Sequence, residues 1–153
     1  MKRFLSLLFG LSVLSFSAAA RERGAMWLGP KAGVYANTGG YVVVGIGAEF
    51  RYGLSERVRV APSAVWLANE GCSVEFACDV QYVLRVAQHW HVYPSAGVSF
   101  NDIGSWAAGV DLGLGMDYAV GRRTDLTAGF KWMPMCGREK NPLAVFAGLS
   151  FRL

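Results

Sequence analysis

Charged residues are scarce in this chain of 153 residues, because Lys, Arg, Asp and Glu make up 17% of it whereas 53% is hydrophobic. So much apolar side chain excludes a disordered protein. Long hydrophobic runs are also missing: beyond the first twenty residues, no apolar run reaches the roughly 18 residues of a membrane-spanning helix. Prolines number only 5, but there are 19 glycines. This combination favours a β protein over a bundle of membrane helices.

The first twenty residues have the pattern of a secretory signal peptide. A basic start precedes an apolar core over residues 4–16, and Ala18 and Ala20 supply the small residues of a cleavage site. We expect cleavage after Ala20, since a membrane anchor would need a longer apolar core. The mature chain, residues 21–153, is then a single domain that works outside the cytoplasm. Loss of two basic residues lowers the formal net charge from +4 to +2, which is too weak to indicate a nucleic-acid partner.

The rest of the sequence alternates with a period of two. From Tyr41 to Tyr52 one parity is apolar and the other is small or charged, and the pattern returns from Val74 and from Trp106. Neighbouring side chains point to opposite faces only in a strand. The connectors are short, carry turn residues and leave no room for a crossover helix, so neighbouring strands must be antiparallel. Eight strands are predicted, over residues 26–36, 41–53, 57–68, 73–86, 90–100, 105–118, 124–133 and 142–153.

An antiparallel meander of eight strands can close into a barrel, and closure removes the exposed sheet edges. The predicted fold class is therefore all-β, an eight-stranded antiparallel up-and-down barrel. One parity carries branched aliphatic and aromatic residues, whereas the other carries charged residues and most of the strand glycines. A soluble barrel is apolar inside and a membrane barrel is the reverse. Because glycines suit a crowded interior, we place the charged parity inside and predict a transmembrane β-barrel.

Outward aromatic residues give a second criterion. If the first strand starts in the periplasm, these residues form two bands near the strand ends, with Val44, Leu112 and Leu149 among the aliphatic residues between them. Amphipathic rings favour the membrane interface, so two bands indicate a membrane barrel. The alternative, a two-sheet sandwich with one polar face, would scatter the aromatic residues. The predicted lipid-interface aromatics are Tyr52, Trp66, Tyr82, Trp90, Trp106, Tyr118, Trp132 and Phe151.

Residues 79–82 (DVQY), 93–98 (YPSAGV) and 110–118 (VDLGLGMDY) carry a resemblance to a known family. With the final strand, residues 148–153, they resemble the small outer-membrane β-barrel proteins of Gram-negative bacteria, the OmpA/OmpX-like or porin-family barrel domain. That final strand is similar to the C-terminal signal read by the outer-membrane assembly machinery. The resemblance implies outer-membrane lipid and this machinery as partners, and we expect a monomer. It implies no single activity, since members serve as structural, adhesive or unassigned proteins.

The inward charges predict either a packed network or a pore. An eight-stranded barrel is too narrow for an open aqueous channel, and an unpaired buried charge is costly, so we expect ion pairs to fill the interior. A narrow porin-like pore for small solutes is the alternative. The predicted barrel-interior network consists of Glu49, Arg51, Arg57, Arg59, Arg85, Asp111, Asp117, Asp125 and Arg152.

Two histidines, His89 and His91, have the inward parity near the periplasmic rim and could hold a metal or act as a base. No Cys or carboxylate nearby has metal-ligand spacing, and Ser95 and Ser99 lie too far along the strand to bond His91. We therefore predict no catalytic residue, no metal and no cofactor. A lipid-modifying outer-membrane enzyme and a soluble barrel that binds a lipophile are the alternative functions.

Three cysteines, Cys72, Cys78 and Cys136, leave one unpaired or pairing between chains. A Cys72–Cys78 disulfide would require the fourth strand to start later, near Asp79. The other reading is a free Cys78 that faces lipid.

Prolines lie within three of the predicted strands. Because proline lacks the ladder N–H, we expect bulges or local breaks there. The positions are Pro30, Pro62 and Pro94.

The external connectors are short, which argues against an adhesin, because adhesion and receptor binding usually use long loops. The longest, residues 134–141, is the place where a partner could dock. We therefore predict a structural or unassigned role in the outer-membrane envelope.

Overall fold

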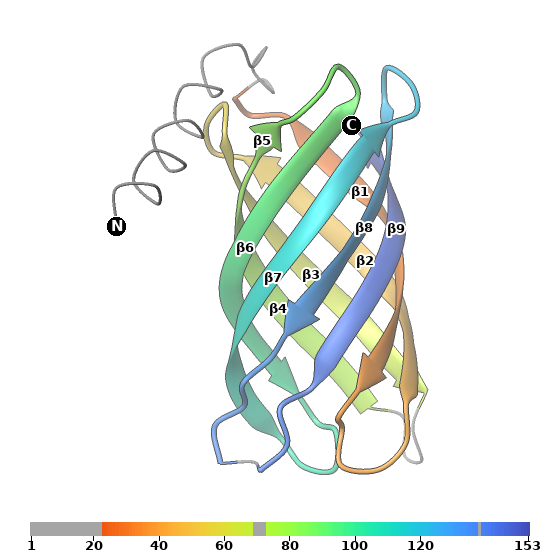
Figure 1. The fold of residues 1–153 in the computed structure, drawn as a ribbon, viewed down its shortest axis with the longest axis vertical. Coiled ribbons are helices and arrows are strands. Elements are labelled where there is room, and N and C mark those ends of the chain that lie inside the picture. The colour runs from red at the N-terminus through yellow and green to blue at the C-terminus, as the bar shows by residue number, and fades with distance from the viewer. Residues whose placement is uncertain (1–22, 69–72, 138) are drawn as a thin grey trace, which may run out of the picture.

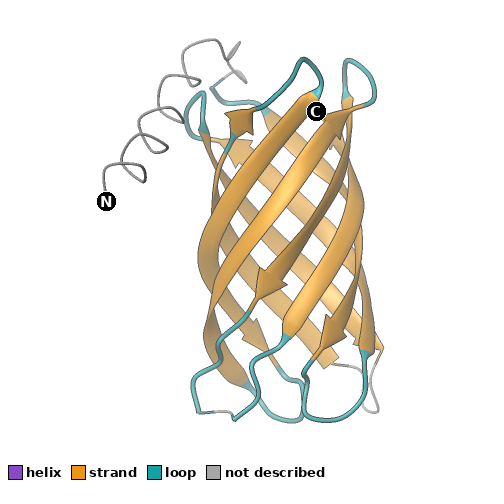
Figure 2. Cartoon of the chain, in the orientation of Figure 1, coloured by secondary structure: helices purple, strands orange, loops and turns teal. Residues whose placement is uncertain are grey.

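The computed structural model describes residues 23–68, 73–137 and 139–153, so the predicted signal peptide lies outside the described residues. Every regular element that it describes is a β-strand (Figure 2). In these three ranges no helix is long and apolar enough to cross a membrane. The strands are β1 (Met26–Ala36), β2 (Val43–Gly53), β3 (Val58–Ala68), β4 (Ser73–Tyr82), β5 (Leu84–Arg85), β6 (Trp90–Asn101), β7 (Ala107–Ala119), β8 (Thr124–Trp132) and β9 (Leu143–Arg152).

The strands form one closed antiparallel sheet (Figure 1). β1 pairs with both β2 and β9, and β4 pairs with β6, so the sheet has no free edge. β5 continues β4, because Gln81 pairs with Ser95 and Leu84 pairs with Val92 in one register. The barrel therefore has eight strands in up-and-down order, as the alternation predicted. Each observed strand end lies within two residues of the predicted one.

Three prolines interrupt the ladders without changing their register. The register places Pro94 opposite Tyr82, and because proline has no N–H, the ladder breaks there into β4 and β5. Pro30 and Pro62 each keep one continuous ladder, with β2 and β4 respectively, and lie at a gap in the other. The expected local breaks are confirmed, whereas these ladders contain no change of register of the kind that a bulge would produce.

Large inward side chains occupy the space left by glycines on the neighbouring strands. Tyr93 of β6 pairs with Gly115 of β7, and a β-carbon built on Gly115 would lie 2.4 Å from Cζ of Tyr93. A β-carbon on Gly45 of β2 would lie 2.9 Å from the Tyr35 ring and 2.7 Å from Val65. Both contacts are closer than real β-carbons make. The inward glycines therefore accommodate particular large neighbours in a narrow interior.

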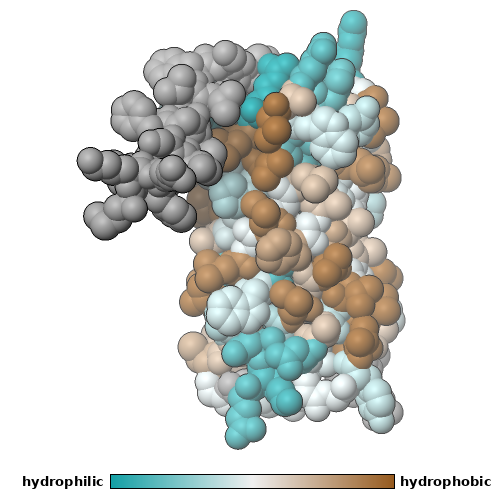
Figure 3. Space-filling view, viewed as in Figure 1, coloured by the Kyte–Doolittle hydropathy of each residue, from teal (hydrophilic) through white to brown (hydrophobic). Residues whose placement is uncertain are grey.

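The outer surface is apolar over a broad band. Val44, Leu112 and Leu149 point outward with exposed fractions of 52%, 44% and 38%. Arg59 and Asp111, in contrast, are buried inside. Figure 3 shows hydrophobic side chains over the middle of the visible face and hydrophilic ones gathered toward the two ends. This distribution is the reverse of that in a soluble protein and matches a surface solvated by lipid.

Candidate functional site in the barrel interior

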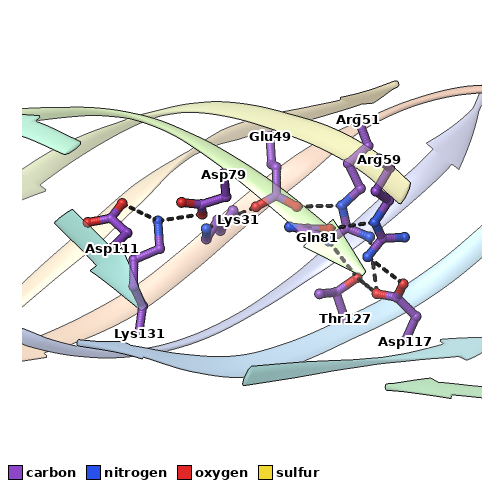
Figure 4. Close-up of polar contacts among 10 residues, drawn as sticks. All are labelled: Lys31, Glu49, Arg51, Arg59, Asp79, Gln81, Asp111, Asp117, Thr127 and Lys131. Carbon is purple, nitrogen blue, oxygen red and sulfur yellow. Dashed lines mark hydrogen bonds and ion pairs between the residues drawn. The ribbon is translucent and has the colours of Figure 1, made fainter. Parts of the chain in front are cut away.

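The barrel interior holds most of the buried charge of the described residues. The buried charged residues share the inward face of their strands, because side chains two residues apart on a strand point to the same side. Figure 4 shows most of these residues in a row along the barrel interior. The buried basic side chains are Lys31, Arg51, Arg59 and Lys131, and the buried acidic ones are Glu49, Glu75, Asp79, Asp111, Asp117 and Asp125.

Arg51 of β2 and Asp117 of β7 join opposite walls of the barrel, since three strands separate β2 from β7 in either direction around the sheet. Arg51 Nη1 lies 3.0 Å from Asp117 Oδ1, and Arg59 Nη2 of β3 lies 2.8 Å from Asp117 Oδ2. Thr127 donates its hydroxyl to Asp117 Oδ1 over 2.8 Å and accepts a bond from Arg51 Nη2 over 3.1 Å. One fully buried carboxylate thus binds two guanidinium groups and a hydroxyl.

The two guanidinium groups are further held by Tyr93 and Gln81. The Arg59 guanidinium carbon lies 4.5 Å from the centroid of the Tyr93 ring, and that of Arg51 lies 5.7 Å from it. Arg59 Nε also donates to Gln81 Oε1. A cation over an aromatic face is stabilised most where water is excluded, as it is here. The packing therefore fixes both arginines in position.

Glu49 extends this cluster along the barrel. It accepts a hydrogen bond from Arg51 Nε, and its Oε2 lies 3.0 Å from Lys31 Nζ. Lys31 Nζ in turn lies 4.1 Å from the centroid of the Phe146 ring. A cavity lined by Lys31, Glu49, Arg51 and neighbours has a volume of about 10 Å³, which is room for about one water molecule. This part of the lumen is filled by side chains.

A second ionic cluster forms around Lys131 of β8. Its Nζ lies 2.8 Å from Asp79 Oδ2 on β4 and 3.0 Å from Asp111 Oδ2 on β7. The three side chains are all buried. Because removal of one partner would leave buried charge uncompensated, such a cluster holds three strands in one arrangement.

Toward the connectors at residues 37–42, 102–106 and 133–142 the interior becomes apolar. Glu75 lies at this boundary and accepts a hydrogen bond from the Tyr35 hydroxyl. The sequence analysis did not predict this apolar plug, because it took all inward-facing positions to be polar or small. The plug consists of Tyr35, Val43, Val65, Leu67, Ile103, Met133, Met135 and Ala144. An ionic layer and an apolar layer therefore fill the lumen in series.

The structure brings six of the nine predicted network members inside the barrel. Glu49, Arg51, Arg59, Asp111, Asp117 and Asp125 are buried. Arg57, Arg85 and Arg152 lie at the rim of the barrel, where they are half-exposed. The physical reason is their place at or beside strand ends, where a long side chain reaches water. Arg85 there donates to the carbonyls of the next turn, at 3.3 Å and 3.4 Å.

Lys31, Asp79 and Lys131 belong to the ionic clusters but were absent from the predicted network. Their inward parity was visible in the sequence, and that signal could have included them. Gln81 and Thr127 share the same parity as their charged neighbours. Which residues meet across the lumen depends on the stagger of the strands, which alternation does not encode.

The structure places the two histidines in different surroundings. His89 lies exposed in the turn before β6, with its ring 6.2 Å from that of the outward Tyr118, so its predicted inward orientation is wrong. His91 pairs with Asp117 in the β6–β7 ladder. Over the described part of the chain, no group of three or more His, Cys, Asp or Glu is placed to hold a metal ion.

Cys72 of the proposed disulfide lies outside the described residues. β4 begins at Ser73, so the later strand start that a Cys72–Cys78 bridge would require is not observed. Cys78 is a free thiol on the outward face of β4, and Cys136 is an exposed free thiol after β8.

The predicted interface aromatics lie toward the two ends of the barrel. Tyr52, Tyr82, Trp90, Tyr118 and Phe151 lie toward the end that carries the C-terminus, which is the upper end in Figure 1. Trp66, Trp106 and Trp132 lie toward the other end, where Trp106 stacks on Phe100 with ring centroids 4.6 Å apart. Their contact with a lipid interface remains a prediction.

No protein-family model and no curated protein matches the sequence. Solved structures do match. The N-terminal barrel domain of OprF from Pseudomonas aeruginosa aligns with a TM-score of 0.72 at 17% identity, covering 86% of this chain and 98% of that one. This is the fold of the small outer-membrane β-barrels. Neisserial surface protein A aligns with a TM-score of 0.65 at 18% identity, covering 86% of this chain and 100% of that one.

A de novo designed transmembrane β-barrel aligns equally well, with a TM-score of 0.65 at 13% identity, covering 88% of this chain and 99% of that one. The resemblance inferred from the sequence is thus confirmed as a likeness of fold. Because a designed chain shares it, the fold by itself carries no activity, and function must be argued from the interior and the surface.

Proposed function

We propose that the chain is an integral protein of the Gram-negative outer membrane, exported by a cleaved signal peptide, whose filled barrel has a structural role in the envelope. The observation that carries the proposal is the inverted surface. Outward residues such as Val44 and Leu112 are apolar and exposed, while the charge of Arg51 and Asp117 is buried within. A soluble lipophile-binding barrel would need the opposite arrangement.

The interior supports a closed barrel over a narrow pore. The Asp117 carboxylate binds arginines from two other strands, and the apolar plug that includes Leu67 and Met133 follows in series. Solute passage would require displacement of both layers. Buried, paired charges of this kind resist separation, since each broken pair leaves uncompensated charge.

Two measurements test the proposal. After expression in a Gram-negative host, the chain is expected in the outer-membrane fraction, with a heat-dependent mobility shift on a denaturing gel because a closed barrel resists the detergent until boiled. A chain that stays soluble and shows no shift would contradict membrane integration. In planar bilayers the folded protein is expected to give no conductance steps. Regular steps would instead establish the porin-like function.

A further inference from the structure

Charge is distributed unequally between the two ends of the barrel. Among the described residues at the end that holds the C-terminus and the turns at residues 54–57, 86–89 and 120–123, the exposed or half-exposed charged side chains are those of six arginines and Glu56. At the opposite end, the described charged side chains are Asp102, Glu139 and Lys140. We name the six arginines the arginine rim: Arg23, Arg57, Arg85, Arg122, Arg123 and Arg152.

The β7–β8 turn presents two members of the arginine rim. Backbone bonds from Val120 and Gly121 to the Thr124 carbonyl, at 3.0 Å and 3.3 Å, close this turn tightly. Arg122 and Arg123 are exposed at its tip. The Arg152 amide donates to the Arg123 carbonyl over 2.8 Å, which brings the end of β9 beside the turn. The fold thus gathers three arginines on rigid backbone.

The arginine rim borders the outward aromatic band. Trp90 and Tyr118 lie with ring centroids 4.8 Å apart, directly below the turns that carry the rim. Arg57 Nη1 donates to the Tyr82 hydroxyl over 3.4 Å, which links a rim arginine to a ring of that band. Aromatic rings of a membrane barrel sit at the depth of the interface. The guanidinium groups next to them are therefore at the depth of lipid phosphates.

We propose that the arginine rim binds the phosphates of anionic glycerophospholipids in the adjoining leaflet. This inference rests on the proposed membrane location. Guanidinium groups bind phosphate oxygens in a bidentate manner and are less strongly hydrated than ammonium groups, which suits an interfacial site. The rim encircles the barrel mouth at the border of the apolar band instead of forming one lateral patch. That shape fits a ring of lipid headgroups better than a single docked protein.

The test uses the full chain folded into nanodiscs that contain equal amounts of phosphatidylglycerol and phosphatidylethanolamine with identical acyl chains. Native mass spectrometry of the released barrel measures which lipid stays bound. We expect phosphatidylglycerol to be enriched several-fold among the bound lipids. The variant R122Q/R123Q is expected to lower this enrichment by about twofold or more, because attraction of anionic lipid scales with the number of basic residues. Salt at ~0.5 M is expected to lower it as well.

A matched pair of variants separates the rim from general charge. R123Q and K140Q each remove one exposed positive charge, at opposite ends of the barrel, and only R123Q is expected to lower the enrichment. Equal effects of the two variants would overturn the proposal, as would equal binding of the two lipids by the unaltered chain. If the chain folds into bilayers of phosphatidylethanolamine but shows no preference for phosphatidylglycerol in the mixed nanodiscs, the lipid-binding proposal is overturned and the membrane proposal is kept. If the chain folds neither into the mixed nanodiscs nor into bilayers of phosphatidylethanolamine, both proposals are overturned.

Discussion

The Tyr93 ring lies where a side chain on Gly115 would have to be, because a β-carbon there would come within 2.4 Å of both Cζ and the hydroxyl oxygen. The same ring supports the Arg59 guanidinium from 4.5 Å. Arg59 in turn binds Asp117. A missing side chain on β7 is therefore linked, through one aromatic ring, to the ionic cluster that spans the lumen.

Gly115→Ala is expected to lower the free energy of unfolding by about 1–3 kcal/mol, because the added methyl group must displace the Tyr93 ring. Urea unfolding of the barrel in lipid vesicles, followed by tryptophan fluorescence, measures the change. Gly121→Ala is the matched control, since nothing lies within 4 Å of its β-carbon position. Its effect is expected within about 0.5 kcal/mol of zero. Equal losses of unfolding free energy in the two variants would show that the Tyr93 ring does not require the space beside Gly115.

Asp117→Leu is expected to destabilise the barrel by about 3–5 kcal/mol, because it leaves two buried guanidinium groups without their shared carboxylate. The double variant Asp117→Leu with Arg51→Leu is expected to lose less than the sum of the single losses. Vesicle unfolding in urea gives all the values for the cycle. Additive losses would mean that the 3.0 Å contact between Arg51 and Asp117 contributes no coupling.

Glu75→Gln is expected to leave stability unchanged or to raise it. Glu75 is buried, and no basic side chain of the described residues lies within ion-pair distance of it. The amide can keep the Tyr35 hydrogen bond while removing a buried negative charge, which is costly where it is uncompensated. The variant is compared with Asp117→Asn under identical urea unfolding. A loss for Glu75→Gln as large as that for Asp117→Asn would indicate that the Glu75 charge is compensated.

Leu112→Arg is expected to cost about 2–4 kcal/mol in a bilayer, whereas Val120→Arg is expected to cost about 0–1 kcal/mol, since the penalty depends on depth in the hydrocarbon. Leu112 lies in the middle of β7 and Val120 directly follows its last residue, and both are exposed, at 44% and 62%. Folding into vesicles of defined thickness, again with urea, gives the two values. A similar cost at both positions would argue against a hydrocarbon belt around β7.

Alternation in the sequence was sufficient to predict the strands and the direction of most side chains. It put Glu49 and Asp111 inside and Val44 outside because strand parity is a local property, unaffected by the rest of the fold. The prolines could also be interpreted locally, since each lacks an N–H and so breaks a ladder wherever its strand pairs. The closed barrel was predicted because eight antiparallel strands without crossover connections leave two sheet edges, and pairing these edges with each other removes both.

The partners within the lumen could not be predicted in this way. Lys131 meets Asp79 and Asp111 only because the strands are staggered, and the stagger of a barrel is a global quantity. The apolar plug was missed for a related reason, since Val43 and Leu67 share parity with charged residues further along their strands. Arg85 was placed inside by parity, but a side chain at a strand end can turn toward water.

The ion pair between Arg51 and Asp117 also has a kinetic consequence. In an open sheet β2 and β7 are far apart, and their side chains can meet only after the two edge strands have paired to close the barrel. Contacts that are absent from the folding transition state slow unfolding and leave the folding rate nearly unchanged. If the barrel closes after the folding transition state, this ion pair lowers the rate at which the folded barrel opens and has little effect on the rate at which it forms.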